Sequence, residues 1–165
     1  MHIGGGFGGK ESRSPIVSLP VAVAAHKLKR PVRCMLDRDE DMVCSGTRHP
    51  FLAKYKVGFD NSGKIKVLEI KLYSNGGNSL DISEGVLDRA IFHCDNAYKI
   101  PNVHIIGRIC KTNIPSNTAF RGFGAPQSML ACETWIEEIS RILGKTEKEV
   151  SFFDIVLCIF LLLLF

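Results

Sequence analysis

The chain contains 165 residues, of which 45% are hydrophobic and 23% are charged, and its formal net charge is +4. This composition is typical of a globular domain and excludes a disordered acidic tail, a collagen-like repeat and a chain built only of membrane helices. A mild positive charge without a long basic run does not predict nucleic-acid binding. A chain of this length can bury the hydrophobic core of one domain, but it is short for two domains.

After an opening glycine cluster, the first third of the chain predicts a helix and a short strand. The Ser14–Pro15 pair is typical of a helix start, and the apolar spacing extends this helix to about Lys29. Pro20 within it predicts a kink or an irregular first turn, because proline removes a backbone donor. Val32–Leu36 indicates a short strand, and residues 37–41 indicate a polar turn.

An antiparallel hairpin is predicted next. Alternate residues from Phe51 to Phe59 are apolar, which predicts a strand with one buried face. Residues 60–63 form a turn signal, and residues 64–73 predict the partner strand. The apolar set of this second strand changes face after Val67, which indicates a bulge.

The second half of the chain predicts two clear helices and one more strand. Residues 83–93 indicate a short helix and residues 103–111 a strand. A longer helix is predicted by apolar residues at helical spacing, which are Met129, Cys132, Ile136, Ile139 and Leu143. Gly144 stands where a C-terminal cap belongs, and Thr146 with Glu149 forms a capping box that predicts another helix. The expected fold class is α+β, with a mixed, mainly antiparallel sheet and helices packed on it.

The cysteines and histidines show no metal-site pattern. The six cysteines lie at positions 34, 44, 94, 110, 132 and 158, without a CxxC pair or a zinc or iron–sulfur spacing. No cleavable signal peptide is predicted, because a glycine cluster follows Met1 almost at once. We therefore expect free, mostly buried thiols in a reducing compartment. The five histidines have no ligand spacing, and no metal is assigned to them.

The glycine cluster at residues 4–9 matches two nucleotide-binding patterns, but its context contradicts both. A dinucleotide fingerprint requires a preceding strand and an acidic residue about 20 positions later, and neither is present. A phosphate-binding loop requires Ser or Thr after Lys10, where this chain has Glu11. A plain glycine turn remains the alternative to a loop that approaches a ligand closely.

Two further features contain side chains that are suited to ligand binding. Phe120, Arg121 and Phe123 form an aromatic–arginine–aromatic loop punctuated by glycines, which can present a ring for stacking and a guanidinium for an anion. A structural role for this loop fits the residues equally well. Arg89 is a lone cation in an apolar patch, and the neighbouring Asp88 favours a simple salt-bridged helix residue.

Taken together, these stretches resemble the xanthine dehydrogenase/aldehyde oxidase family of molybdenum hydroxylases. The resemblance covers part of its molybdenum-cofactor-binding region, in order, through five segments: Gly4–Glu11, Arg30–Asp41, Arg48–Phe59, Asp88–His93 and Lys111–Gly124. Aldehyde oxidases usually lack the glutamate of the first segment and the arginine of the fourth, and this chain has both Glu11 and Arg89. The resemblance is therefore to the purine-hydroxylating branch, xanthine dehydrogenase.

The resemblance implies a role for five residues. Phe7 and Arg121 would lie beside the molybdenum centre as cofactor-binding residues that contact it without ligating the metal through a side chain. Glu11 would hydrogen-bond the purine, and Arg89 would orient it and stabilise developing negative charge. Phe123 would pack against the purine ring. The general base of this family lies beyond the chain, so we assign no catalytic base within it.

The resemblance also implies what surrounds this chain. The family oxidises hypoxanthine and xanthine to urate, takes oxygen from water and passes electrons through 2Fe-2S clusters and FAD to NAD, as homodimers in the cytoplasm or the peroxisome. The cofactor expected here is molybdenum–molybdopterin, in a partial site, while the iron–sulfur and FAD regions are absent. Nucleic-acid and membrane partners are not expected, and we expect the 165-residue chain alone to be inactive.

The resemblance ends at Val150, which divides the chain into a partial cofactor-binding domain at 1–150 and an apolar tail at 151–165. This tail is shorter than the about 20 apolar residues of a spanning helix. A membrane anchor, a buried core segment and a gene-model artefact compete as interpretations, and we favour the artefact. The alternative function is a non-catalytic truncated product with a membrane-associating tail. A nucleotide-phosphate module is disfavoured by Glu11.

Overall fold

The computed structural model describes residues 4–152. Its elements, in chain order, are α1 (Gly9–Ser12), α2 (Ser14–Leu28), α3 (Arg38–Ser45), β1 (Phe51–Phe59), β2 (Ile65–Gly77), α4 (Ser83–Phe92), β3 (Val103–Lys111), α5 (Ala125–Leu143) and α6 (Glu147–Phe152). The apolar tail predicted at 151–165 lies almost wholly outside the described residues, and its interpretation stays a prediction.

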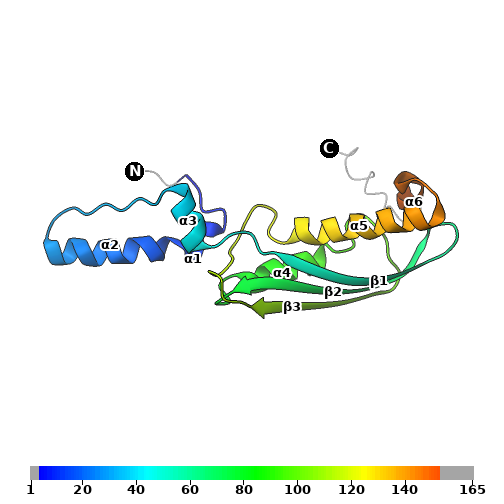
Figure 1. Cartoon of the computed structure of the whole chain (residues 1–165), viewed down its shortest axis with the longest axis horizontal. Coiled ribbons are helices and arrows are strands. Elements are labelled where there is room, and N and C mark those ends of the chain that lie inside the picture. The colour runs from blue at the N-terminus through cyan, green and yellow to red at the C-terminus, as the bar shows by residue number, and fades with distance from the viewer. Residues whose placement is uncertain (1–3, 153–165) are drawn as a thin grey trace, which may run out of the picture.

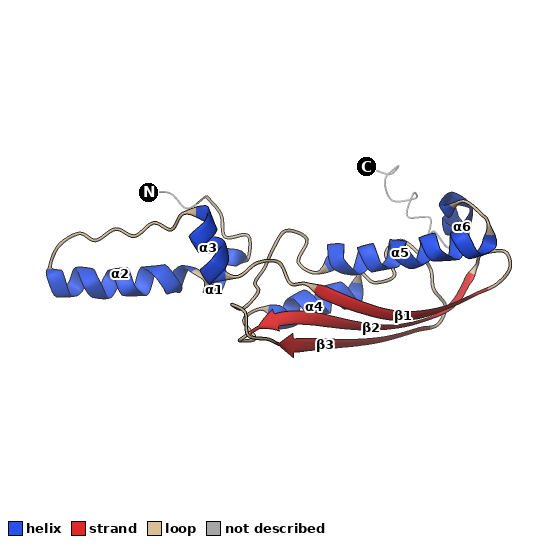
Figure 2. Cartoon of the chain, viewed as in Figure 1, coloured by secondary structure: helices blue, strands red, loops and turns tan. Residues whose placement is uncertain are grey.

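The sheet has three strands in the order β1-β2-β3 (Figure 2). Strand β1 pairs with β2 in antiparallel fashion, as the hairpin pattern predicts, and β3 joins β2 in parallel. Helix α4 lies in the connection from β2 to β3, since parallel neighbours need a crossover rather than a tight turn. The expected α+β fold with a mixed sheet is confirmed.

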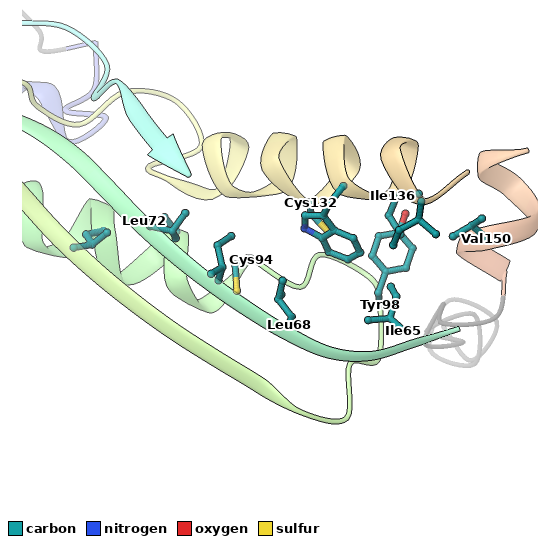
Figure 3. Packing of buried hydrophobic residues seen from close by; sticks show 13 residues of the cluster. Ile65, Leu68, Leu72, Cys94, Tyr98, Cys132, Ile136 and Val150 are labelled. Atoms are coloured by element: carbon teal, nitrogen blue, oxygen red, sulfur yellow. The ribbon is translucent and has the colours of Figure 1, made fainter. Parts of the chain in front are cut away.

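One face of the sheet carries the hydrophobic core. Leu68, Ile70 and Leu72 of β2 are at most 1% exposed and share this face. They cluster with residues of α4 and α5, among them Cys132 and Ile136, as the close view in Figure 3 shows. Helix α5, predicted from its apolar spacing, therefore packs across the sheet and buries its apolar stripe there.

The opposite face of the sheet carries polar side chains. Lys71 forms a salt bridge of 3.4 Å with Glu69, and the Lys54 ammonium lies 6.0 Å from the ring centre of Tyr73. Strand residues of this face are half-buried or exposed. Within the described residues, the fold is a two-layer arrangement in which helices cover one face only.

The predicted bulge of the hairpin is confirmed. Gly58 pairs with Val67, but the next residue, Phe59, pairs with Ile65, so β2 contains one extra residue. The extra residue resets the alternation, and Ile65 and Leu68 are consequently both fully buried. In the turn, the Asp60 carboxylate accepts hydrogen bonds from the Ser62 and Lys64 amides, which closes the hairpin.

Other local predictions are also confirmed. Strand β3 has the predicted bounds, and α4 ends one residue before the predicted position. Gly144 adopts the left-handed conformation that ends α5. The Glu149 carboxylate accepts a hydrogen bond of 2.8 Å from the Thr146 amide, and the Thr146 hydroxyl accepts one of 3.3 Å from the Glu149 amide, so the capping box starts α6.

Two predictions between α2 and β1 are wrong. Val32–Leu36 is extended but forms no strand, because no strand of the described chain lies beside it to pair with. The polar turn predicted at residues 37–41 is instead the start of helix α3. Asp37 and Glu40 form a capping box there, and this pattern can be recognised in the sequence.

Helix α2 extends away from the sheet (Figure 1). It runs as one α-helix through Pro20, and none of its residues is buried. The apolar residues predicted for one helix face, among them Leu19, Val23 and Leu28, are 57–64% exposed. Part of the hydrophobic surface of the described chain is therefore not covered by other elements of it.

The thiols are free but not mostly buried, which corrects the sequence prediction. Cys94 and Cys132 are buried in the core, whereas Cys34, Cys44 and Cys110 are exposed. The first two exposed cysteines lie around α3, where no core forms, and Cys110 lies near the end of the edge strand β3. Cys158 is outside the described residues.

Residues 4–152 contain no cluster of three or more metal-ligating side chains. Among these same residues, no helix has the length and apolar character needed to cross a membrane.

Candidate functional site

Three candidate residues lie on two loops, the glycine loop at residues 4–9 and the segment 116–124 before α5, while Glu11 lies on α1 and Arg89 on α4 (Figure 1). Gly8 has φ of +82°, and a Cβ atom built on it would lie only 2.5 Å from the Cβ of Ala119. The two loops can approach this closely only because residue 8 has no side chain.

Phe7 is presented to the surface by the glycine loop. Its φ is +51°, in the left-handed region that a bulky residue rarely adopts, and its side chain is 87% exposed. The Lys10 ammonium donates a hydrogen bond of 2.8 Å to the carbonyl of Gly5, which closes the loop on itself. The exposed ring contributes little to packing within the described chain.

The base of segment 116–124 is rigidly held. Asn117 is 1% exposed and bonds to three partners: its amide nitrogen donates to the carbonyl of Asn75, and its amide oxygen accepts from the amide and the hydroxyl of Thr47. Beyond this base the chain turns outward, and Arg121 is exposed at the tip. The Arg48 guanidinium lies 4.5 Å from the ring centre of the neighbouring Phe120.

Phe123 packs against helix α4, on which Arg89 lies. The Phe123 ring lies over Gly85, with ring carbons 3.3 and 3.4 Å from the position that a Cβ of Gly85 would occupy. Arg89 is four residues after Gly85, so both lie on the same face of α4, and helical side chains lean toward the N-terminus. Arg89 is exposed and Phe123 is half-buried. The Phe123 ring and Arg89 therefore share one face of α4, one helical turn apart, and their proposed roles stay predictions.

Glu11 lies on α1, directly after the glycine loop, and its side chain is exposed. The Glu11 amide donates a hydrogen bond to the carbonyl of Gly8, so the position of this carboxylate follows that of the loop. Phe7 and Glu11 thus belong to one side of the Gly8–Ala119 contact, and Arg121 belongs to the other.

Sequence reasoning missed a buried ion pair beneath the site. The Arg13 guanidinium lies 3.3 Å from the Asp81 carboxylate, and the two side chains are 14% and 8% exposed. Burial favours a raised pKa for Asp81, but the Ser12 and Thr118 hydroxyls, the Ile82 amide and the Arg13 charge together outweigh it, so this pKa lies below its ordinary value. No sequence spacing connects Arg13 with Asp81, and only the tertiary fold reveals the pair.

His49 was also missed. It is 1% exposed, and its Nε2 atom lies 2.7 Å from the hydroxyl of Ser83, the first residue of α4. Burial lowers the pKa of His49 below its ordinary value of 6.5, so the imidazole is held neutral. The histidine anchors the start of α4 to the segment that precedes β1.

A separate hollow of about 300 Å³ lies at the ends of β2 and β3. Gly76 to Leu80 line one side, and Ile109 to Lys111 line the other. None of the five candidate residues contributes to it. The candidate site is therefore an open surface formed by two loops and α4, and the hollow is a neighbour of that surface.

This surface offers an open backbone, a guanidinium, an aromatic ring and a carboxylate to a ligand. The positions that Cβ atoms of Gly4 and Gly6 would occupy have no atom within 4 Å, so the loop backbone is open to a ligand. Arg121 offers an exposed guanidinium to an anionic group. Phe123 offers a ring for packing, and Glu11 offers hydrogen-bond acceptors.

The chain belongs to the molybdopterin cofactor-binding domain family, which it matches over residues 1–151. It is 64% identical over 149 residues to xanthine dehydrogenase/oxidase of Gallus gallus and 62% identical over 149 residues to that of Rattus norvegicus. Each match covers 90% of this chain and 11% of the relative. Xanthine dehydrogenase of Dictyostelium discoideum is 58% identical over 155 residues, which is 92% of this chain and 11% of that protein.

Solved structures agree with this assignment. Aldehyde oxidoreductase from Desulfovibrio desulfuricans superimposes with a TM-score of 0.83 and 27% identity, over 93% of this chain and 17% of that one. Quinoline 2-oxidoreductase from Pseudomonas putida gives a TM-score of 0.80 and 29% identity, over 94% of this chain and 20% of that one. The chain spans about a tenth of the length of the curated relatives it matches, since each match covers 11%.

Proposed function

We propose that this chain is part of a molybdenum hydroxylase of the xanthine dehydrogenase type, which oxidises hypoxanthine and xanthine to urate with oxygen from water. The observation that carries the proposal is the identity of 58–64% to xanthine dehydrogenases along nine-tenths of the chain. The presence of both Glu11 and Arg89 favours a purine rather than an aldehyde as substrate.

Three residues would act on the purine. The Phe123 ring, which lies against α4, would pack against the planar heterocycle of the purine. The Glu11 carboxylate would accept hydrogen bonds from the ring N–H groups of the purine. The Arg89 guanidinium, on the same helix face that Phe123 covers, would orient the substrate and stabilise the negative charge that develops as a ring carbon is attacked.

Two residues would hold the cofactor. The open backbone around Gly4 and Gly6 allows close approach, and Phe7 and Arg121 would lie beside the molybdenum centre. When bound, molybdenum–molybdopterin supplies the oxygen transfer and accepts the electrons of the oxidation. The protein contributes orientation, charge and exclusion of water around the reacting ring.

The remaining functions belong to the rest of a longer polypeptide. We propose that 2Fe-2S clusters and FAD outside this chain carry electrons to NAD, and that the general base also lies outside it. The full-length protein would be a homodimer of the cytoplasm or the peroxisome. The partial domain would end near residue 150, because the family match ends at residue 151.

A chimera tests this function. Residues 1–151 replace the equivalent segment of the Gallus gallus enzyme, and urate formation from xanthine is measured together with the molybdenum content. We expect an active chimera, whose Arg89→Met variant loses roughly 100-fold or more of its xanthine turnover, as when an oxyanion-stabilising donor is removed. The exposed Arg141 on α5 gives a matched control, Arg141→Met, which retains activity. A chimera that binds molybdenum but does not oxidise xanthine would contradict the proposal.

A further inference from the structure

The most buried ion pair of the site has no part in the proposed chemistry. Arg13 stands between α1 and α2, Asp81 stands just before α4, and their charged groups are 3.3 Å apart. At 14% and 8% exposure, the pair contrasts with Arg141 and Glu137 on α5, which are 73% and 44% exposed. A pair this buried contributes a fixed geometry that a solvated surface pair does not.

We propose that Arg13 and Asp81 are positioning residues, which clamp the glycine loop against segment 116–124 and the start of α4. This inference rests on the proposed function, because it assigns the clamp to the alignment of cofactor-binding and purine-binding residues. Neither side chain reaches the exposed surface itself, so both would act through the residues that they hold in place.

The Arg13 guanidinium joins three segments of the chain. Besides its contact with Asp81, the same terminal nitrogen donates a hydrogen bond of 2.7 Å to the carbonyl of Ser116. That carbonyl is tightly enclosed, because a Cβ built on Gly46 would lie only 1.9 Å from its oxygen. A buried carbonyl with so little free space depends on the guanidinium as its partner.

Each of the three segments carries candidate residues. Arg13 follows Glu11 by two residues in a continuous helical path, with Ile16 bonded back to Arg13 and Glu11 bonded back to Gly8. On the second segment, Ser116 lies at the base from which Arg121 projects. The Asp81 side is continuous with α4, and hence with Arg89, through a hydrogen bond from the Val86 amide to the carbonyl of Ile82.

Asp81 shows a second sign of being held by the tertiary structure. Its φ is +46°, in the left-handed region, although it is not a glycine. Asp tolerates this conformation better than most residues, but it is still maintained only where the surroundings require it. The carboxylate is thereby turned toward Arg13, and its lowered pKa keeps it charged in the neutral range.

The geometry favours arginine over lysine. One terminal nitrogen, Nη2, makes both contacts, and the planar guanidinium fixes its position between the carbonyl and the carboxylate, whereas a lysine ammonium is a point charge on a flexible stem. Arg13→Lys should therefore keep the charge and lose the alignment. Arg13→Met removes both and leaves Asp81 buried without its partner.

The test uses the full-length chimera with the molybdenum cofactor. The variants Arg13→Met, Arg13→Lys and Asp81→Asn are compared with Arg141→Met for xanthine kinetics, molybdenum content, melting temperature and hydrogen exchange of the amides at residues 5–9. Because a misplacement of about 1 Å can cost 100-fold in rate, we expect Arg13→Met to lower kcat by roughly 10- to 100-fold. We expect Arg13→Lys to recover only part of that loss, and loop exchange to become faster in all three variants.

Kinetics and exchange equal to those of Arg141→Met would overturn the clamp. So would full rescue by Arg13→Lys, or loss of activity that only follows a lower melting temperature. If Arg13→Met does not fold, Arg13→Lys and Asp81→Asn decide the question by loop exchange and kcat. If the parent chimera shows no xanthine turnover, the proposed function fails, but faster exchange at residues 5–9 still supports the clamp and unchanged exchange still refutes it.

Discussion

Gly8→Ala should separate the two loops that form the candidate site. Gly8 has φ of +82° and ψ of −40°, which an alanine adopts only at a cost of about 1–3 kcal/mol. The added methyl group would lie 2.5 Å from the Cβ of Ala119, whereas carbon atoms in contact are normally about 3.5–4.0 Å apart. Relief of this overlap requires the loops to move apart by about 1 Å or more.

That movement acts directly on the proposed chemistry. Phe7 and Glu11 lie on the side of Gly8, and Arg121 lies on the side of Ala119, so the separation changes their mutual distances. A shift of about 1 Å can reduce a rate by roughly 100-fold, and we expect a loss of that order in kcat/KM for xanthine. Steady-state kinetics and the melting temperature of the chimera measure the two effects separately.

Gly144→Ala is the matched control. Gly144 also has a positive φ, +63°, but no atom lies within 4 Å of its Cβ position, so an alanine there meets strain without overlap. It should lower the melting temperature and leave the kinetics unchanged. If Gly8→Ala retained the kcat/KM of the parent, or lost no more than Gly144→Ala, the argument from loop contact would be refuted.

Three further predictions concern stability and activity. His49 has a lowered pKa in the folded state, so its contribution to stability is present above 6.5 and is lost as the pH falls below that value; the rate of thermal inactivation should rise less steeply with acidification in His49→Gln than in the parent. Trp135, at 1% exposure, fills the core between α5 and the sheet, and Trp135→Ala should cost about 3–5 kcal/mol and shorten the half-life at elevated temperature, unlike the exposed Thr134→Ala. The isolated 165-residue chain should show no xanthine turnover, which a urate assay with added molybdenum cofactor checks.

Local periodicity made much of the fold predictable. The apolar spacing of α5 and the alternation in β1 identify which face each element buries, because burial on one face imposes that period. The parallel pairing of β3 was not specified, since alternation within a strand is the same in either direction. Val32–Leu36 shows the reverse case: a strand-like composition forms no strand without a partner to receive its hydrogen bonds.

In the candidate site, the exposed residues and the contacts that support them differ in how far the sequence reveals them. The residues proposed for the surface of this site come from the family resemblance, and Phe7, Arg89 and Arg121 do lie at exposed positions, while their roles stay predictions. The contacts that hold the surface were not predictable, because Arg13 meets Asp81 only after the chain has folded. Neither charge has a neighbour in the sequence that marks it as paired.

The contacts beneath the exposed residues thus hold the candidate site together. Segment 116–124 is closely packed at two points where the facing residue is a glycine. Gly8 faces Ala119, and Gly46 faces Ser116. Close approach alone limits how near the loops can come, but it does not prevent them from parting. The Arg13 guanidinium supplies that second restraint by binding the Ser116 carbonyl and the Asp81 carboxylate together. Loosening either restraint should therefore disturb the same distances between the exposed residues, and Gly8→Ala and Arg13→Met should combine to less than the sum of their separate effects on the activation free energy.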